Sequence, residues 1–271
     1  ITYSQTGDSS VLSLVERPLP EPGPGEVRVR IAVSGVNPTD WKARQGGRPF
    51  SWDEVTPDQD GAGIVDAVGD GVDSPSTGQR VWVYLAQHER PTGTAAEHAV
   101  IPATRAVPLA DAASFALGAS LGVPAMTAHR ALTVHENGPA RLAPGALDGR
   151  TVLVQGGAGA VGHAAIQLAV WAGATVIATV SSDEKEALAR AAGAHHVLQY
   201  PSDALADGIR ELAPDGVDHI VEVAIADNAA LDVEVIANHG SIGYYADNGG
   251  DRFSAAVRAS FAKNVRWQGL L

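Results

Sequence analysis

A glycine-rich turn between an apolar run and an alanine-rich segment is the part of the sequence best suited to chemistry. The run 151–154 (TVLV) is apolar and β-branched, as buried strands are, and the glycines after it satisfy the spacing G-x-G-x-x-G. Gly157 would allow a sharp turn, Gly159 would remove a side chain that blocks a pyrophosphate, and Gly162 would let the next helix pack against the strand. Free main-chain N–H groups and the positive end of the helix dipole would then face phosphates. A strand before the motif and a helix after it predict dinucleotide binding rather than a surface turn, with contacts from Gly157, Gly159, Ala160, Val161 and Gly162.

The end of the next predicted strand bears on the choice between NAD and NADP. An NAD site usually has an acidic residue there, about 20 residues past the glycines, to hold the ribose 2′-hydroxyl. This chain has Ser181 and Ser182 in that place and Lys185 one turn later, and neutral donors with a cation suit the dianionic 2′-phosphate. One of these serines could also cap the following helix, and the two roles are compatible. Although Asp183 and Glu184 lie close by, the sequence favours NADPH.

A second group of polar side chains occupies a loop near residue 40. Residues 37–40 could simply form a turn in which Asp40 caps a short helix that begins at Trp41, and a cleft role for Asn37 rests on the family resemblance given below. Gln59 and Asp60 are more simply interpreted as turn residues. The chain has no cysteine, and its nine histidines show no repeated ligand spacing, so we predict no metal site.

Two kinds of element would position these residues. Up to about residue 110 the chain reads as short strands with Gly/Pro turns, which predicts a compact barrel-like domain that begins with a hairpin over residues 1–17. From residue 151 strands and helices alternate, and the apolar strands predict a doubly wound parallel sheet covered on both faces. The expected strands of this sheet are 151–154, 175–180, 196–198, 218–223, 240–245 and an edge strand over 265–271. The expected helices are 112–121, 124–132, 163–172, 183–192, 203–212 and 228–236.

Composition limits the partners. A net charge of −12 argues against nucleic acid and anionic membranes. The N-terminal segment is polar and lacks a signal-peptide pattern, and no apolar stretch is long enough for a membrane span, so we expect a cytoplasmic protein.

These motifs together resemble the medium-chain dehydrogenase/reductase superfamily, and within it the zinc-free NADPH:quinone oxidoreductase (zeta-crystallin-like) branch. The resemblance is carried by GVNPTD at 35–40, GAGIV at 61–65, GQRV at 78–81, AMTA at 125–128, the glycine motif at 151–162, and GA at 193–194. It implies an α/β fold in which a GroES-like barrel domain over 1–118 precedes a Rossmann-type domain over 119–271. The family's chain then returns to complete the first domain, and because this sequence stops near the last strand we expect that return to be absent.

The resemblance also implies roles for individual residues. Asn37 would lie near the nicotinamide carboxamide, and Thr39 occupies the position of a proton-relay hydroxyl in zinc-containing relatives. Thr127 would contact the cofactor, and Tyr245 would lie by its nicotinamide half. Lys185 and Tyr200 match positions that contact the 2′-phosphate. Zinc-containing relatives have Cys and His where this chain has Asn37 and Gln59, so the likeness favours a metal-free enzyme.

The expected reaction is hydride transfer from NADPH to a quinone, with a proton from Thr39 or water. An NADPH-dependent enone or enoyl-thioester reductase is the alternative, and a non-catalytic NADPH-binding protein is a third reading. The apolar tail 265–271 predicts a homodimer that pairs through this edge strand.

Overall fold

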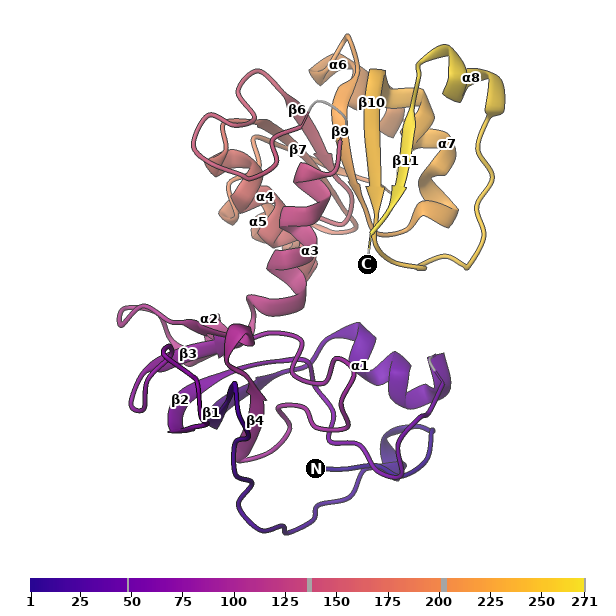
Figure 1. Ribbon diagram of the computed structural model, residues 1–271. Helices are drawn as coiled ribbons and strands as arrows, with labels where there is room; N and C mark the ends of the chain where they lie inside the picture. Colours follow the sequence, from indigo (N-terminus) through magenta and orange to yellow (C-terminus); the bar gives the residue numbers. More distant parts are fainter. Residues whose placement is uncertain (48, 136–137, 201–203, 271) are drawn as a thin grey trace. The chain divides into compact units, whose positions relative to one another are not determined.

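The computed structural model describes residues 1–47, 49–135, 138–200 and 204–270. It divides into two compact units, an N-terminal unit (Ile1–Val123) and a C-terminal unit (Pro124–Leu271), and each is described by itself. Figure 1 shows the elements of each unit along the chain. Among the described residues, no helix is long and apolar enough to cross a membrane.

The N-terminal unit is built on a five-stranded antiparallel sheet of order β4-β1-β2-β3-β5. Its strands are β1 (Glu26–Gly35), β2 (Asp60–Val68), β3 (Arg80–Val83), β4 (His98–Pro102) and β5 (Ala106–Pro108). Its helices are α1 (Pro38–Lys42) and α2 (Phe115–Ala119), with short helical turns at Ser9–Val11, Ala43–Gly47 and Ala103–Arg105. Alternate residues of the strands form the core, because side chains on a strand point to opposite faces. This antiparallel sheet agrees with the β-rich N-terminal domain that the sequence predicts.

The N-terminal segment does not form the expected hairpin. Only single bridges are present, from Thr2 to Ser13 and from Tyr3 to Val55. Asp8 accepts the main-chain N–H of Ser10 and so starts a short helical turn where a strand was expected. Leu14 is 89% exposed and Val15 39% exposed, so the apolar residues expected to form the strand do not supply a buried face.

The C-terminal unit is a six-stranded parallel sheet of order β11-β10-β9-β6-β7-β8, which confirms the predicted doubly wound sheet. Its strands are β6 (Thr151–Val154), β7 (Thr175–Val180), β8 (His196–Gln199), β9 (Val217–Glu222), β10 (Ile236–Tyr244) and β11 (Arg266–Gly269). Its helices are α3 (Gly122–Thr133, whose first two residues belong to the N-terminal unit), α4 (Ala160–Trp171), α5 (Asp183–Ala191), α6 (Leu205–Leu212), α7 (Ile225–Val235) and α8 (Val257–Ala262). Asp203, the first residue of one predicted helix, and Leu271, the last residue of the predicted edge strand, lie outside the described residues.

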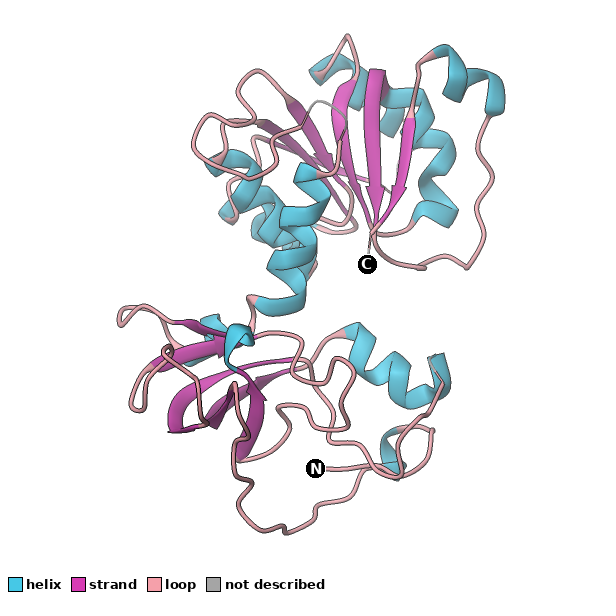
Figure 2. Ribbon diagram, viewed as in Figure 1, coloured by secondary structure: helices cyan, strands magenta, loops and turns pink. Residues whose placement is uncertain are grey.

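Helices cover both faces of this sheet (Figure 2). Val152 and Val154 pack with α3, α4 and α5, while Leu153 between them packs with α6 and α7 on the other face. This alternation explains the continuous apolar strands, since each strand is buried on both sides. The helix α8 was not expected, and it supplies the connection between the parallel strands β10 and β11 that a short turn could not make.

The neighbours of β6 decide where the site lies. β6 pairs with β7 on one side and with β9 on the other. The strands that follow β6 are therefore added first on one side of it and then on the other, so the strand order reverses at β6. Ligands of doubly wound sheets bind at the carboxyl ends of the strands at such a reversal. The glycine turn follows β6 at this point.

Candidate nucleotide site and polar centre of the N-terminal unit

The glycine turn is held by three different constraints. Gly156 has a φ of 70°, in the left-handed region, so the sharp turn lies at Gly156 and not at Gly157 as the motif suggested. A Cβ on Gly157 would lie 2.9 Å from Ala178 Cβ, so this glycine lets the turn pack against β7. A Cβ on Gly162 would lie 2.3 Å from the carbonyl oxygen of Gly156, so this glycine lets the helix pack closely against the turn.

The start of α4 presents donors beside this turn. Gly159 is the N-cap residue and is exposed, and the only atom within 4 Å of a Cβ there would be the Gly156 carbonyl oxygen, at 3.4 Å. The N–H of His163 bonds to the Gly159 carbonyl at 2.7 Å, so the N–H groups of the three residues before it have no helical carbonyl to reach. Those residues are Ala160, Val161 and Gly162. Free N–H groups and an exposed glycine at a helix N-terminus form an anion-binding geometry.

A cation and a hydroxyl meet at the carboxyl end of β7. Lys185 Nζ donates to Ser181 Oγ at 2.7 Å, so these two predicted phosphate ligands lie together. Ser182 is the N-cap residue of α5 and its hydroxyl accepts the N–H of Lys185, so the capping role is observed. The main-chain N–H of Tyr200 donates to the Val180 carbonyl at 2.9 Å, which brings Tyr200, 48% exposed, next to the same strand end.

Two further predicted cofactor residues belong to the C-terminal unit. Thr127 lies half-buried in α3. Tyr245 follows β10, and its main-chain N–H donates to the carbonyl of Glu222. Burial and then the charge of Glu222 raise the pKa of the Tyr245 hydroxyl, so this phenol stays protonated.

A buried polar network beneath the glycine turn was missed by sequence reasoning. Thr179 Oγ1 accepts the N–H of Gly156 at 3.4 Å and donates to Gln155 Oε1 at 2.5 Å. Gln155 Nε2 donates to Asp232 Oδ1 at 3.2 Å. Asp232 in turn lies within hydrogen-bonding reach of Glu222, and both carboxyl groups are fully buried.

The polar loop of the N-terminal unit forms a compact buried centre. Asn37 is the N-cap residue of α1, and its main-chain N–H donates to Asp40 Oδ2 at 2.7 Å. Asn37 Nδ2 donates to Asp60 Oδ2 at 2.8 Å, and the N–H of Val123 donates to the same oxygen at 2.7 Å. Helix α1 begins at Pro38 and not at Trp41, so Asn37 caps it while Asp40 completes a capping box. Asp60, which the sequence suggested to be a turn residue, begins β2 and holds the Asn37 amide.

The pKa values of Asp40 and Asp60 are both raised. Burial raises the pKa of Asp40 to about 7, and the charges of Asp58 and Asp60 add to the shift. Burial also raises the pKa of Asp60 to about 6, although the N–H of Val123 and the Asn37 amide act in the opposite direction. Asp40 therefore exchanges its proton near neutral pH.

A hollow of about 160 Å³ lies beside Thr39 within the N-terminal unit. Aromatic side chains of Tyr3, Phe50 and Trp52 line it, and Gln59 and Arg90 supply polar groups. The Tyr3 and Phe50 rings are 5.7 Å apart between centroids. Flat apolar walls with a few polar groups suit a planar ring.

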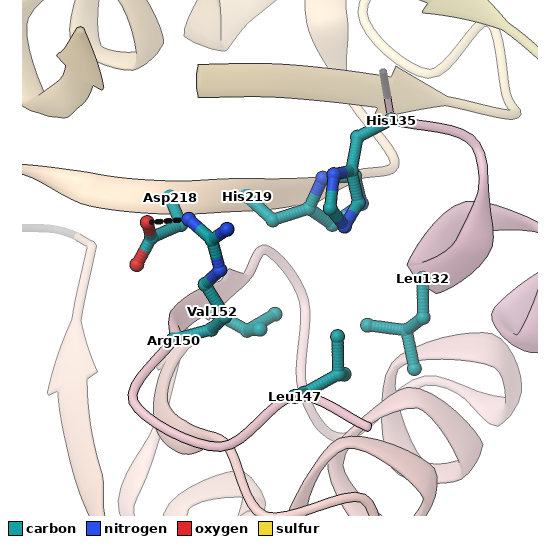
Figure 3. Close-up of a pocket in the computed structure, with 7 residues that line it drawn as sticks. All are labelled: Leu132, His135, Leu147, Arg150, Val152, Asp218 and His219. Carbon is teal, nitrogen blue, oxygen red and sulfur yellow. Dashed lines mark hydrogen bonds and ion pairs between the residues drawn. The ribbon is translucent and has the colours of Figure 1, made fainter. Parts of the chain in front are cut away.

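A much smaller cavity lies between α3 and β9, shown in Figure 3. The imidazoles of His135 and His219 face each other there with ring centroids 5.3 Å apart, and Arg150 pairs with Asp218 at 2.8 Å (Figure 3). Burial lowers the pKa of His219 to about 4, so its ring is neutral, and its Nε2 contacts the carbonyl of Ala131. The cavity volume is about 10 Å³, which is room for a single water molecule and not for a substrate.

Comparison with known proteins agrees with both units. Residues 23–111 match the family described as "Alcohol dehydrogenase GroES-like domain", and residues 160–271 match "Zinc-binding dehydrogenase". The quinone oxidoreductase of Rattus norvegicus is 33% identical over 231 residues, 83% of this chain and 65% of that protein. The quinone oxidoreductase of Lama guanicoe is 31% identical over 249 residues, 89% of this chain and 71% of that protein. A mycobacterial protein solved with NADPH is 30% identical with a TM-score of 0.84, covering 100% of this chain and 81% of that one.

Fold and comparisons define a protein with a GroES-like unit followed by a Rossmann-type unit. The chain belongs to the medium-chain dehydrogenase/reductase family, and its relatives support the zinc-free quinone oxidoreductase branch. It spans 65% of the length of the rat relative.

The zinc in the second family description does not fit the donors of this chain. Among the described residues, no three His, Cys, Asp or Glu side chains converge where a metal ion could be held. Asn37, which stands in place of a ligand in zinc-containing relatives, uses its amide N–H to bond Asp60. With its amide nitrogen bonded to Asp60, Asn37 can offer only its amide oxygen, which is not among the usual zinc ligands.

Proposed function

We propose that this protein is an NADPH-dependent oxidoreductase that reduces a quinone without zinc. The observation that carries the proposal is the pairing of an anion-binding helix start with a lysine–serine pair at the next strand end. The first suits a diphosphate, and the second suits a 2′-phosphate. NADPH in the related mycobacterial structure supports the same cofactor for this chain.

Each part of the cofactor has residues suited to hold it. The N–H groups of Ala160, Val161 and Gly162 would receive the diphosphate, beside the open Gly159. Lys185, with Ser181 and the adjacent Ser182 and Tyr200, would receive the 2′-phosphate. Thr127 and Tyr245 would orient the nicotinamide half. When bound, NADPH supplies the hydride.

The acceptor would occupy the hollow beside Thr39. Its aromatic walls suit a planar quinone ring, and the quinone oxidoreductase relatives support this substrate class. Because the donors do not fit a metal, the acceptor must take hydride readily on its own, as quinones do. Thr39 is among the residues that line the hollow, and its hydroxyl would pass a proton to the reduced oxygen.

We also propose that the protein forms a homodimer through β11. This strand is at the end of the sheet and leaves one edge for pairing with a second copy. Light scattering should give the mass of a dimer, and a monomer at micromolar concentration would contradict it.

The cofactor assignment is tested by titrating NADPH and NADH side by side into the wild type and Lys185→Ala. Loss of a charge-assisted contact should weaken NADPH binding by about tenfold and leave NADH unchanged. Arg190→Ala is the matched control, because Arg190 lies on the same helix and pairs with Glu186. Equal binding of the two cofactors, unaffected by Lys185→Ala, would contradict the proposal.

The substrate assignment is tested by NADPH oxidation with a panel of quinones and a panel of enones. Turnover with quinones, unchanged by a zinc chelator, is expected. Turnover with enones alone would establish the alternative C=C reductase, and no turnover with either would favour a non-catalytic NADPH-binding protein.

A further inference from the structure

The buried carboxyl pair under the glycine turn has no part in the function proposed above. Glu222 ends β9 and Asp232 lies in α7, and both have 0% exposure. Their two carboxyl groups lie within hydrogen-bonding reach of each other. Two adjacent carboxylates cannot both ionise away from water, so the pair must hold a proton.

The donors around the pair decide which acid carries this proton. Glu222 faces the main-chain N–H of Ala224 and the amide of Asn228, whose nitrogen lies 3.2 Å from each carboxylate oxygen. Asp232 Oδ1 accepts from Gln155, while no donor among the described residues reaches Asp232 Oδ2. A proton on Oδ2 would satisfy this oxygen and donate to Glu222. The unpartnered Oδ2 of Asp232 and the donors that face Glu222 together favour the proton on Asp232 and the charge on Glu222.

The pKa of Asp232 agrees with this assignment. Burial raises the pKa of Asp232 well above its ordinary value, and the charge of Glu222 adds to the shift. Burial raises the pKa of Glu222 as well, but the donors from Ala224 and Asn228 oppose that shift. Among the described residues, the groups that face the pair are the amides of Gln155 and Asn228, the N–H groups of Val223 and Ala224, and Tyr245. Of these Tyr245 titrates, and its pKa is also raised.

A chain of three hydrogen bonds links Asp232 to the glycine turn. Asp232 accepts from the Gln155 amide, whose oxygen accepts from the Thr179 hydroxyl, whose oxygen accepts from the Gly156 N–H. Gly156 is the left-handed residue of the turn, and its carbonyl lies against Gly162 in the first turn of α4. The peptide that the network holds is thus the one that sets the path of the turn.

We propose that Asp232 is a positioning residue that carries a proton and, through Gln155 and Thr179, fixes the glycine turn for the diphosphate of the cofactor. This inference rests on the proposed function for its ligand. In this proposal Asp232 holds the glycine turn as a neutral carboxylic acid and not as a carboxylate.

Two substitutions separate a neutral acid from an anion. Asp232→Asn reproduces the protonated form, because its amide donates to Glu222 and its oxygen accepts from Gln155. Asp232→Leu keeps the branched shape of the side chain but removes both bonds. We expect Asp232→Leu to raise the Kd for NADPH about tenfold with kcat at saturation unchanged, and Asp232→Asn to bind within about twofold of wild type. Asp227→Asn, an exposed acid of the same helix, is the control and should bind as wild type.

The pH profile adds a readout that lost packing would not give. In the wild type the affinity should fall on the alkaline side, where the pair loses its shared proton, and in Asp232→Asn this fall should be absent. Asp232→Asn as weak as Asp232→Leu, an alkaline fall that persists in it, or unchanged binding in Asp232→Leu would each overturn the proposal.

Two measurements without cofactor keep the proposal separate from the proposed function. In the infrared difference spectrum between the wild type and Asp232→Asn, the carbonyl band of one protonated carboxylic acid should appear, because the bands of Asp40 and Asp60 are common to both proteins and cancel. Amide exchange at Gly156 and Gly157 should be about tenfold faster in Asp232→Leu but not in Asp232→Asn. If NADPH bound to no variant while both results held, the proposed function would fail and the positioning role would stand. Absence of the band would overturn the positioning role, and it does so even if Asp232→Leu does not fold.

Discussion

The two units bury acidic groups beside their candidate ligand sites, but they stabilise them differently. In the N-terminal unit Asp40 and Asp60 each accept a main-chain N–H, from Asn37 and Val123. In the C-terminal unit Asp232 accepts from a side-chain amide, that of Gln155, and faces a second buried acid, Glu222. Asp40, Asp60 and Asp232 each leave one buried oxygen without a donor among the described residues. The difference is that Asp232 faces a carboxyl group, and two interacting carboxyl groups titrate as one unit. The first arrangement orients a side chain, Asn37, and the second orients a stretch of backbone.

The largest expected difference between the units is in NADPH affinity, when alanine replaces a glycine that has no room for a Cβ. Gly162→Ala would place a Cβ 2.3 Å from the Gly156 carbonyl, which the turn holds in place. We expect the Kd for NADPH to rise by about 100-fold, as measured by fluorescence titration. Gly122 and Asp60 both belong to the N-terminal unit. Gly122→Ala would place a Cβ 2.1 Å from Asp60 Oδ1, which is a side-chain atom and not main chain. It should lower the free energy of unfolding but leave the NADPH Kd within about threefold, and unchanged affinity in Gly162→Ala would contradict the assignment of the turn.

The titration of Asp40 is the next largest effect. Because the pKa of Asp40 is raised from 3.8 to about 7, the folded state binds this proton more tightly than the unfolded state does. The stabilisation is therefore complete at low pH and is lost as the pH rises from about 4 to about 7, by on the order of 4 kcal/mol. Asp40→Asn should remove this loss in urea unfolding measured across that range. The exposed Asp53→Asn should keep the wild-type slope, and a slope that survives Asp40→Asn would show that another group causes it.

His219 should produce the opposite dependence in the C-terminal unit. Its pKa is lowered from 6.5 to about 4 by burial, so its contribution is complete above pH 6.5 and is lost as the pH falls toward 4. The loss is on the order of 3 kcal/mol. His219→Gln, which keeps a neutral donor toward Ala131, should flatten the acid limb of the unfolding profile. His239→Gln, at an exposed position, should not, and an acid limb unchanged by His219→Gln would contradict this explanation.

The smallest expected effect on stability comes from two serine N-caps, one in each unit, which make the same kind of bond. Ser182 caps α5 and Ser114 caps α2 through the same kind of side-chain bond to a main-chain N–H. Ser182→Ala and Ser114→Ala should each lower the free energy of unfolding by about 1 kcal/mol. Only Ser182→Ala should also weaken NADPH binding, by a few-fold. Equal NADPH affinity in both variants would restrict Ser182 to capping.

The regions that the sequence predicted well are those whose geometry depends on neighbouring residues. The glycine turn, the cap at Ser182 and the alternating strands of the parallel sheet follow from short-range spacing. The hairpin predicted for residues 1–17 failed because Asp8 and Ser10 satisfy the main chain locally. The position of the left-handed glycine was wrong by one residue, since the motif does not show which peptide packs against β7.

The polar network could not be assembled from local patterns, because its members come from four elements. Gln155, Thr179 and Glu222 each lie at or near the carboxyl end of a different strand. Such ends meet at one edge of a parallel sheet, so a polar residue at the end of each apolar strand was an available signal. The contribution of Asp232 depends on how α7 packs, and no spacing along the chain gives that.

The contact between Lys185 and Ser181 has a consequence for redesign of the cofactor preference. A common route to NADH is to place an acid at the end of this strand for the free ribose hydroxyl. Here a carboxylate introduced at Ser181 would meet the Lys185 ammonium, which already lies 2.7 Å from the serine oxygen. The new acid would then be neutralised by its neighbour instead of accepting from the ribose. Conversion to NADH therefore requires removal of the lysine in the same step as the new acid.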